Sequence, residues 1–225
     1  MIKAVLFDMD GTLIDSEKIY RASWLWAMDQ LGISIDTEHF FKSVSGMNIA
    51  TIQAFCEREY GEAFPFYKVR EIRRPYLLKC VEEKGIARKA GVPDVLYTLR
   101  RMGIRIAVAT SAGGDWARQC LAAAGIDVGT FDYMITGECV ERSKPDPDMF
   151  LKAADALGVM PSECVVAEDS TNGVRAGCAA GMKTVMIPDL QPCTDELRSL
   201  LWACIDSLEP LPAMIEKYNE SEIDT

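Results

Sequence analysis

The chain contains a single histidine, His39, among its 225 residues. Chemistry that relies on a Ser-His pair, a histidine nucleophile or several histidine ligands is therefore nearly excluded. His39 lies in the segment DTEHFF, beside residues that are typical of a helix start. We expect it at the surface or at a helix end, and not in a catalytic site.

Closely spaced cysteine pairs, long apolar runs and an excess of positive charge are also missing. None of the eight cysteines forms a C-x-x-C pair, which favours reduced thiols in a cytoplasmic protein. The apolar stretch in MIKAVLFDMD is too short for a signal or membrane segment. Lys and Arg number 24 against 34 Asp and Glu, which disfavours a nucleic-acid binder. We expect a cytoplasmic protein with no nucleic-acid partner, no membrane association and no required protein partner.

The apolar pattern predicts an α/β fold with a helical insertion. Short apolar strands alternate with helices from about residue 89 onward, as in βαβ units with a parallel sheet. Residues 16–88 show helical spacing throughout, although Pro75 should bend or break the third helix of this part. The sequence therefore predicts a Rossmann-like core, residues 1–15 and 89–225, that is interrupted by an all-helical cap at residues 16–88.

Polar side chains follow three of the predicted strands of this core, and a lysine lies between a fourth strand and the helix after it. They are Asp8 and Asp10, Thr110 and Ser111, Lys144, and Glu168 and Asp169. Ligands of parallel α/β sheets bind beyond the carboxyl ends of the strands. Carboxylates, hydroxyls and an ammonium group suit a phosphate and a hard cation such as Mg²⁺, which prefers oxygen ligands.

These residue types can carry out phosphoryl transfer. An aspartate such as Asp8 can act as the nucleophile, and Asp10, two residues on along an extended chain, points the same way and can exchange protons. Thr110 and nearby backbone N–H groups can hold the transferring oxygens. Each position also has an ordinary explanation. The two aspartates can be turn residues, Lys144 a surface lysine, and the Glu168–Asp169 pair a helix cap.

Four motifs in order resemble the haloacid dehalogenase superfamily. DMDGTLIDSE resembles its first motif, IAVAT its second, the lysine of SKPDP its third and VVAEDS its fourth. The resemblance implies that Asp8 is the nucleophile and Asp10 the general acid and base, while Thr110 and Lys144 bind the phosphoryl group. It also implies that Mg²⁺ is held by Asp8, the Asp10 carbonyl, Glu168 and Asp169. The helical insertion is similar to the small cap of the β-phosphoglucomutase-like branch.

Three functions remain open within this family. Asp10 and the Glu168–Asp169 pair argue against a dehalogenase, and Asp10 argues against a phosphonatase. In the mutase a cap loop carries an arginine for the distal phosphate, but the similar stretch SGMNIATI has none, although Lys79, Arg73 or Arg74 could compensate. The sequence therefore favours a phosphatase of a sugar or polyol phosphate over a hexose-phosphate mutase. A phosphate-binding protein without activity is the third alternative.

Overall fold

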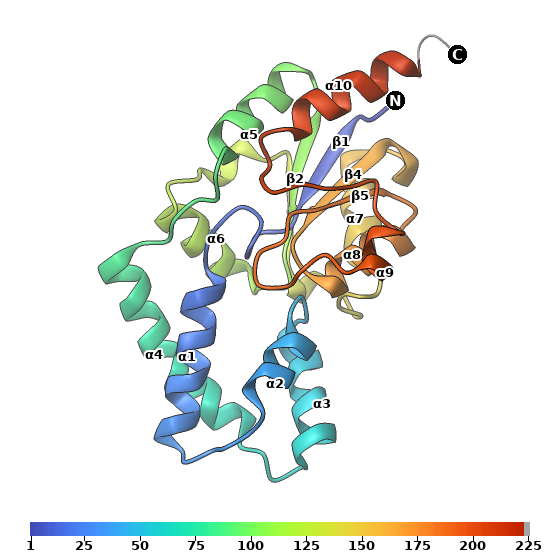
Figure 1. The fold of residues 1–225 in the computed structure, drawn as a ribbon. Coiled ribbons are helices and arrows are strands. Elements are labelled where there is room, and N and C mark those ends of the chain that lie inside the picture. Colours follow the sequence, from blue (N-terminus) through green and yellow to red (C-terminus); the bar gives the residue numbers. More distant parts are fainter. Residues whose placement is uncertain (223–225) are drawn as a thin grey trace.

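A computed structural model describes residues 1–222 of the chain. Its centre is a parallel six-stranded sheet with the strand order β3-β2-β1-β4-β5-β6 (Figure 1). The strands are β1 (Ala4–Phe7), β2 (Arg105–Ala109), β3 (Tyr133–Ile135), β4 (Cys164–Glu168), β5 (Lys183–Met186) and β6 (Ala203–Cys204). The predicted Rossmann-like α/β class is confirmed. β1 lies at the middle of the sheet and pairs with both β2 and β4.

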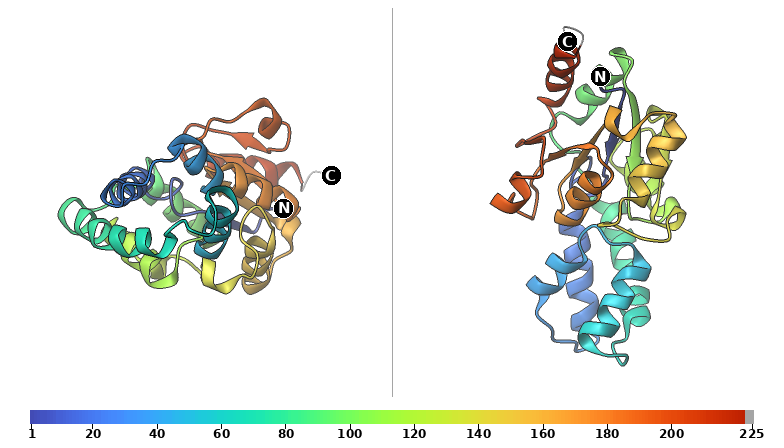
Figure 2. Two further views of the ribbon diagram at one scale, coloured as in Figure 1. Left: turned by 90° about the horizontal axis from the view of Figure 1, so that it is seen from below. Right: turned by 90° about the vertical axis from the view of Figure 1, so that its right-hand side faces the viewer.

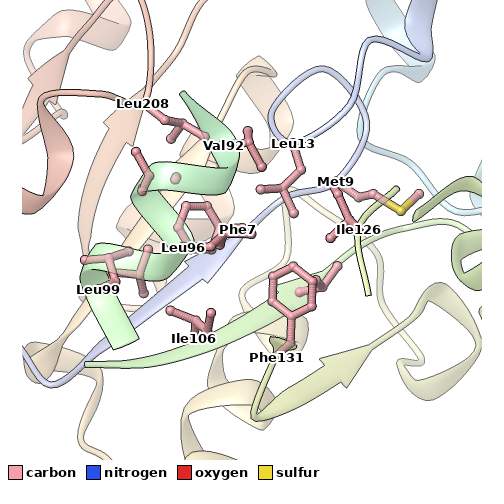
Figure 3. Close-up of a cluster of buried hydrophobic side chains, with 14 of the residues drawn as sticks. Phe7, Met9, Leu13, Val92, Leu96, Leu99, Ile106, Ile126, Phe131 and Leu208 are labelled. Carbon is pink, nitrogen blue, oxygen red and sulfur yellow. The ribbon is translucent and has the colours of Figure 1, made fainter. Parts of the chain in front are cut away.

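Helices cover both faces of the sheet, because successive residues of each strand point to opposite faces. Val5 and Phe7 belong to one apolar cluster with side chains of α5, α6 and α10, part of which is drawn in Figure 3. Ala4 and Leu6 belong to a second cluster with α7 and α8. The core helices are α5 (Val92–Arg101), α6 (Gly114–Ala123), α7 (Asp148–Leu157), α8 (Thr171–Ala179), α9 (Asp195–Arg198) and α10 (Leu211–Ser221). A strand buried on both faces cannot move without disturbing two packed layers.

Four helices between β1 and α5 form a separate bundle beyond one end of the sheet (Figures 1 and 2). They are α1 (Glu17–Gln30), α2 (Thr37–Val44), α3 (Ile49–Tyr60) and α4 (Phe66–Lys84). Their own apolar cluster is rich in aromatic side chains, and the ring centroids of Trp24 and Phe40 lie 5.1 Å apart. This bundle corresponds to the predicted helical cap.

The expected break at Pro75 does not occur, because α4 runs from Phe66 to Lys84 with the proline inside it. A proline removes one backbone hydrogen bond from a helix interior. Pro75 lies on the exposed side of α4. The carbonyl group that loses its partner can therefore be hydrated, which lowers the cost of the missing bond.

The two chain segments that join the cap to the core run beside each other. The Asp15 N–H donates to the Ala87 carbonyl at 2.8 Å, and the Lys89 N–H donates to the Leu13 carbonyl at 3.0 Å. Ile14 and Arg88 form an antiparallel bridge between these two bonds. The chain thus enters and leaves the cap at one place. None of the helices in residues 1–222 is long and apolar enough to cross a membrane.

Candidate active site

The carboxyl end of β1 places Asp8 at the centre of the sheet edge. The backbone N–H of Asp8 donates to the Ala167 carbonyl on β4, so the position of Asp8 is continuous with the sheet pairing. The chain then turns at Gly11, and the Ser16 hydroxyl donates a short hydrogen bond to Asp10 Oδ1. Asp8 and Asp10 both line the same cavity. The structure thus brings the two predicted aspartates together at a ligand-binding edge.

Lys144 is completely buried beneath Asp8. Its ammonium group donates to Asp8 Oδ1 at 2.5 Å, to Glu168 Oε1 at 2.7 Å and to the Ala109 carbonyl at 3.0 Å. These three bonds use every proton of the ammonium group. Burial alone would lower the pKa of Lys144, but Asp8 and Glu168 outweigh it and raise that pKa. The lysine therefore remains charged and fixes one oxygen of Asp8.

Glu168 is the last residue of β4, which pairs with β1, and Asp169 follows it directly. Glu168 Oε2 accepts hydrogen bonds from the Asp169 N–H at 3.0 Å and from both the N–H and the hydroxyl of Ser170 at 2.9 Å. Ser170 also caps α8, because its hydroxyl accepts from the Gly173 N–H at 3.0 Å. Glu168 is thus fixed by Lys144 on one oxygen and by a helix N-terminus on the other.

Two glycines make room for these carboxylates. A Cβ atom at Gly173 would lie 1.7 Å from Glu168 Oε1, and one at Gly11 would lie 2.3 Å from Asp169 Oδ2. Gly11 also has a φ of +86°, which side chains rarely adopt. Sequence reasoning did not single out either glycine, although the glycine of D-x-D-G is part of the first motif. Any side chain at these positions would displace the acidic groups.

Three buried carboxylates lie close enough to hold a metal ion. One oxygen each from Asp8, Glu168 and Asp169 can be chosen so that all lie within 4.8 Å of one another. Burial is the main cause that raises the pKa of both Asp8 and Asp169 well above the usual range, and neighbouring carboxylates add to it. Lys144 supplies only one compensating charge. A hard divalent cation that prefers oxygen ligands fits this set of donors.

Thr110 and Ser111 follow β2 and line the same cavity as the aspartates. Thr110 is buried, and its Oγ1 accepts a hydrogen bond from the Ala112 N–H at 3.1 Å. The Ser111 hydroxyl donates to the Gly46 carbonyl of the cap at 2.6 Å. Ser111 therefore already makes a contact between cap and core, and its predicted role in phosphate binding stays a prediction.

The cap lies over this edge of the core, and a cavity of about 410 Å³ that opens to solvent lies between them. Cap and core also touch through the hydroxyls of Thr51 and Ser143 at 2.7 Å, and Asn172 Nδ2 donates to the Ser45 carbonyl at 2.8 Å. The cavity floor carries Asp8, Asp10 and Asp169, and the cap contributes apolar side chains and four arginines, namely Arg21, Arg70, Arg73 and Arg74. The cavity is thus acidic on the core side and basic on the cap side.

The cap residues named in the sequence analysis divide between the cavity and the surface. Arg73 and Arg74 line the cavity, whereas Lys79 lies 3.8 Å from Glu83 with 71% of its side chain exposed. His39 is half-exposed on the cap, 3.3 Å from Glu59. Sequence reasoning missed Arg21, Arg70 and Glu17 as cavity residues. Their helical spacing gave no sign of which face turns toward the core.

The fold and this edge define a Rossmann-like α/β protein with a helical cap and an acidic centre that is supported by a buried lysine. The family model for haloacid dehalogenase-like hydrolases matches residues 5–187. The chain belongs to this family, and it carries the cap of the β-phosphoglucomutase-like branch.

Known proteins of this family resemble the chain along most of its length. Hexitol phosphatase A of Escherichia coli is 32% identical over 189 residues, which are 82% of each chain. The solved structure of CbbY from Rhodobacter sphaeroides in complex with phosphate has a TM-score of 0.77 at 28% identity and covers 94% of this chain and 96% of its own. For β-phosphoglucomutase from Clostridium difficile the TM-score is 0.81 at 25% identity, with 99% and 100% covered.

One relative is much longer than this chain. SUPPRESSOR OF QUENCHING 1, a chloroplastic protein of Arabidopsis thaliana, is 31% identical over 195 residues. These residues are 83% of this chain but 18% of that protein. The shared part is therefore a small fraction of that longer protein.

Proposed function

We propose that this chain is a Mg²⁺-dependent phosphatase of a small phosphorylated metabolite of the sugar or polyol class. The observation that carries the proposal is the placement of Asp8. One of its oxygens is held by Lys144, and Asp8 lines the cavity between cap and core. The similarity to hexitol phosphatase A supports the substrate class.

In the first step, an oxygen of Asp8 attacks the phosphorus atom and the bond from phosphorus to the substrate oxygen breaks, which leaves an aspartyl-phosphate. Lys144 fixes Asp8 Oδ1, so Oδ2 is the oxygen available for attack. Thr110 lines the cavity beside these groups and can bind a phosphoryl oxygen. Mg²⁺, held by Asp8, Glu168, Asp169 and the Asp10 carbonyl, would neutralise the phosphate charge that otherwise repels a carboxylate.

Asp10 supplies and then removes a proton. Burial raises the pKa of Asp10 to about 6, and the hydrogen bond from Ser16 opposes part of this shift. A carboxyl group with this pKa can give its proton to the leaving oxygen near neutral pH. The resulting carboxylate then takes a proton from the water that attacks the aspartyl-phosphate. Phosphate leaves, and Asp8 and Asp10 return to their starting forms.

The test is phosphate release from a panel of sugar, polyol and nucleotide phosphates, with and without Mg²⁺. We expect Mg²⁺-dependent release from one or a few polyol or sugar phosphates. Asp8→Asn should lower it by at least about 1,000-fold, because the nucleophile is lost. Asp94→Asn, at an exposed position of α5, is the matched control and should keep wild-type activity. Release that survives in Asp8→Asn would contradict the assignment of the nucleophile.

A hexose-phosphate mutase is the second candidate. It is favoured by Arg70, Arg73 and Arg74, which one helix, α4, presents to the cavity opposite Asp8. Arginines suit a second phosphate group. Conversion of glucose 1-phosphate into glucose 6-phosphate, without release of inorganic phosphate, would support this candidate over the phosphatase. Phosphate binding with neither activity would support a non-catalytic protein.

A further inference from the structure

Glu17 lines the cavity but has no role in the mechanism proposed above. It is the first residue of α1, directly after the segment that joins core and cap, and its side chain lines the cavity together with Asp10 and Tyr20. Within residues 1–222, the Glu17 carboxyl group makes no hydrogen bond and no ion pair. It is therefore a partly exposed carboxyl group that faces the cavity and has no protein donor.

The charged neighbours of Glu17 are already engaged with other groups. Arg21, one turn further along α1, places its guanidinium 3.1 Å from Glu38. Asp189, which lies on the core side, pairs with Lys89 at 2.8 Å. Neither residue therefore satisfies Glu17. A third charged neighbour, Arg73, donates to the Ser23 hydroxyl at 3.2 Å, so a group that enters the cavity is left to bind Glu17.

An acidic residue in the first turn of a helix often only balances the helix dipole. That role does not require burial, since an exposed carboxylate would serve it as well. At Glu17, burial first and then the charges of Asp10 and Asp189 raise the pKa to about 8. Glu17 is partly exposed to the cavity, so water can reach its carboxyl group, and a ligand that displaces this water must donate a hydrogen bond in its place.

We propose that Glu17 is a specificity-determining residue that accepts hydrogen bonds from hydroxyl groups of the substrate near its phosphoester. This inference rests on the proposed phosphatase function and narrows it to polyhydroxylated substrates. Glu17 and Asp10 line the same cavity, and the charge of Asp10 acts on Glu17, so the group that Glu17 binds belongs to the part of the substrate close to the leaving oxygen. An alkyl or aryl phosphate would leave the carboxyl group unsatisfied. A site built to bind a hydroxyl group typically reacts far more slowly with an analogue that lacks this hydroxyl.

The test compares substrates that differ only in their hydroxyl groups. Glucitol 6-phosphate and hexyl phosphate have the same carbon chain and the same phosphoester. In the wild type we expect kcat/KM for glucitol 6-phosphate to exceed that for hexyl phosphate by about 100-fold or more. In Glu17→Ala this ratio should fall to within about threefold of one, while hexyl phosphate is hydrolysed at the wild-type rate. Glu17→Gln keeps an acceptor oxygen and should retain part of the ratio.

Glu71→Gln is the matched control, because Glu71 is 70% exposed on α4 and pairs with Lys68 at the surface. This variant should keep the wild-type ratio. An unchanged ratio in Glu17→Ala would overturn the inference. So would an equal loss for both substrates, which would assign Glu17 to the proton transfer or the metal site instead.

A binding measurement separates this inference from the phosphatase function. In the Asp8→Asn variant, dissociation constants for glucitol 6-phosphate and hexyl phosphate can be measured by calorimetry without turnover. We expect tighter binding of glucitol 6-phosphate, and loss of this preference when Glu17→Ala is added. Wild-type protein that hydrolyses no phosphate ester but shows this preference would refute only the phosphatase function. Hydrolysis of both esters with no preference in either assay would refute only the role of Glu17.

Discussion

Lys144 and Glu168, on the core side of the cavity, have more protein partners than Glu17 and Arg74, on the cap side. On the core side, the Lys144 ammonium group has three acceptors and Glu168 accepts from four donors. On the cap side, Glu17 and Arg74 have no ion-pair partner within residues 1–222. Groups with complete sets of partners are held in one geometry, as a reaction centre needs. Groups without partners are available to a ligand, so the core is suited to chemistry and the cap to selection.

The largest expected effect follows from removing the buried lysine of the core, Lys144. Lys144→Met leaves Asp8 and Glu168 as uncompensated buried carboxylates. We expect a loss of about 3–5 kcal/mol in the free energy of unfolding and a loss of about 100-fold or more in phosphate release. Urea denaturation and the phosphate assay measure the two effects.

The control for this variant is Lys152→Met, because Lys152 is 45% exposed and pairs with Asp148 on the surface. It should change the free energy of unfolding by less than about 1 kcal/mol. A Lys144→Met protein as stable as this control would show that the core does not depend on the buried ion pairs.

A second variant tests whether the cap packs independently of the core. Phe40 is completely buried in the aromatic cluster of the cap, and Phe40→Ala should cost roughly 3 kcal/mol of local stability. Native-state hydrogen exchange should speed up in α1 to α4 and stay unchanged in β1, β2 and β4. Equal acceleration in both regions would mean that the chain unfolds as one unit. Phe40→Leu keeps most of the volume and should have a smaller effect.

The smallest expected effect is a change with pH in the free energy of unfolding, which tests whether Glu17 lacks a protein partner. Its pKa is raised from about 4.5 to about 8, so the folded state binds this proton more tightly than the unfolded state. The free energy of unfolding of the metal-free protein should therefore fall as the pH rises from about 4.5 to 8. Glu17→Gln should be more stable than the wild type by roughly 1–3 kcal/mol at pH 8, and the difference should vanish below pH 4.5. Denaturation at a series of pH values measures this, and parallel curves would contradict it.

The sequence predicts the core well, because its evidence is local. Each strand is a short apolar run, and the polar residue that follows it must reach the same edge of a parallel sheet. Asp8, Lys144, Glu168 and Asp169 do meet there. Sequence reasoning expected Lys144 to bind the phosphoryl group, but it did not foresee that three protein acceptors use all of its protons. This complete set of acceptors depends on how distant parts of the chain pack around Lys144, and no local sequence pattern encodes that packing.

The cap was less predictable, because its important features depend on exposure and orientation. Pro75 is tolerated within α4 because it faces solvent, and the sequence does not state which face that is. Glu17 has the appearance of an ordinary acid at a helix start. Only the closure of the cap over the core shows that its carboxyl group enters a cavity. The predicted boundaries of the cap at residues 16 and 88 stay a prediction.

The paired linkers have a consequence for how this family can diversify. Because Leu13 to Asp15 and Ala87 to Lys89 are bonded to one another, the entry and exit of the inserted helices share one short ribbon. A segment attached in this way can be replaced by another of different length without moving either end of the surrounding chain. The ribbon therefore serves as a single attachment point for the inserted helices. Chimeras that exchange these helices between relatives at the ribbon should keep the sheet intact. They should also acquire the substrate preference of the protein that donates the helices.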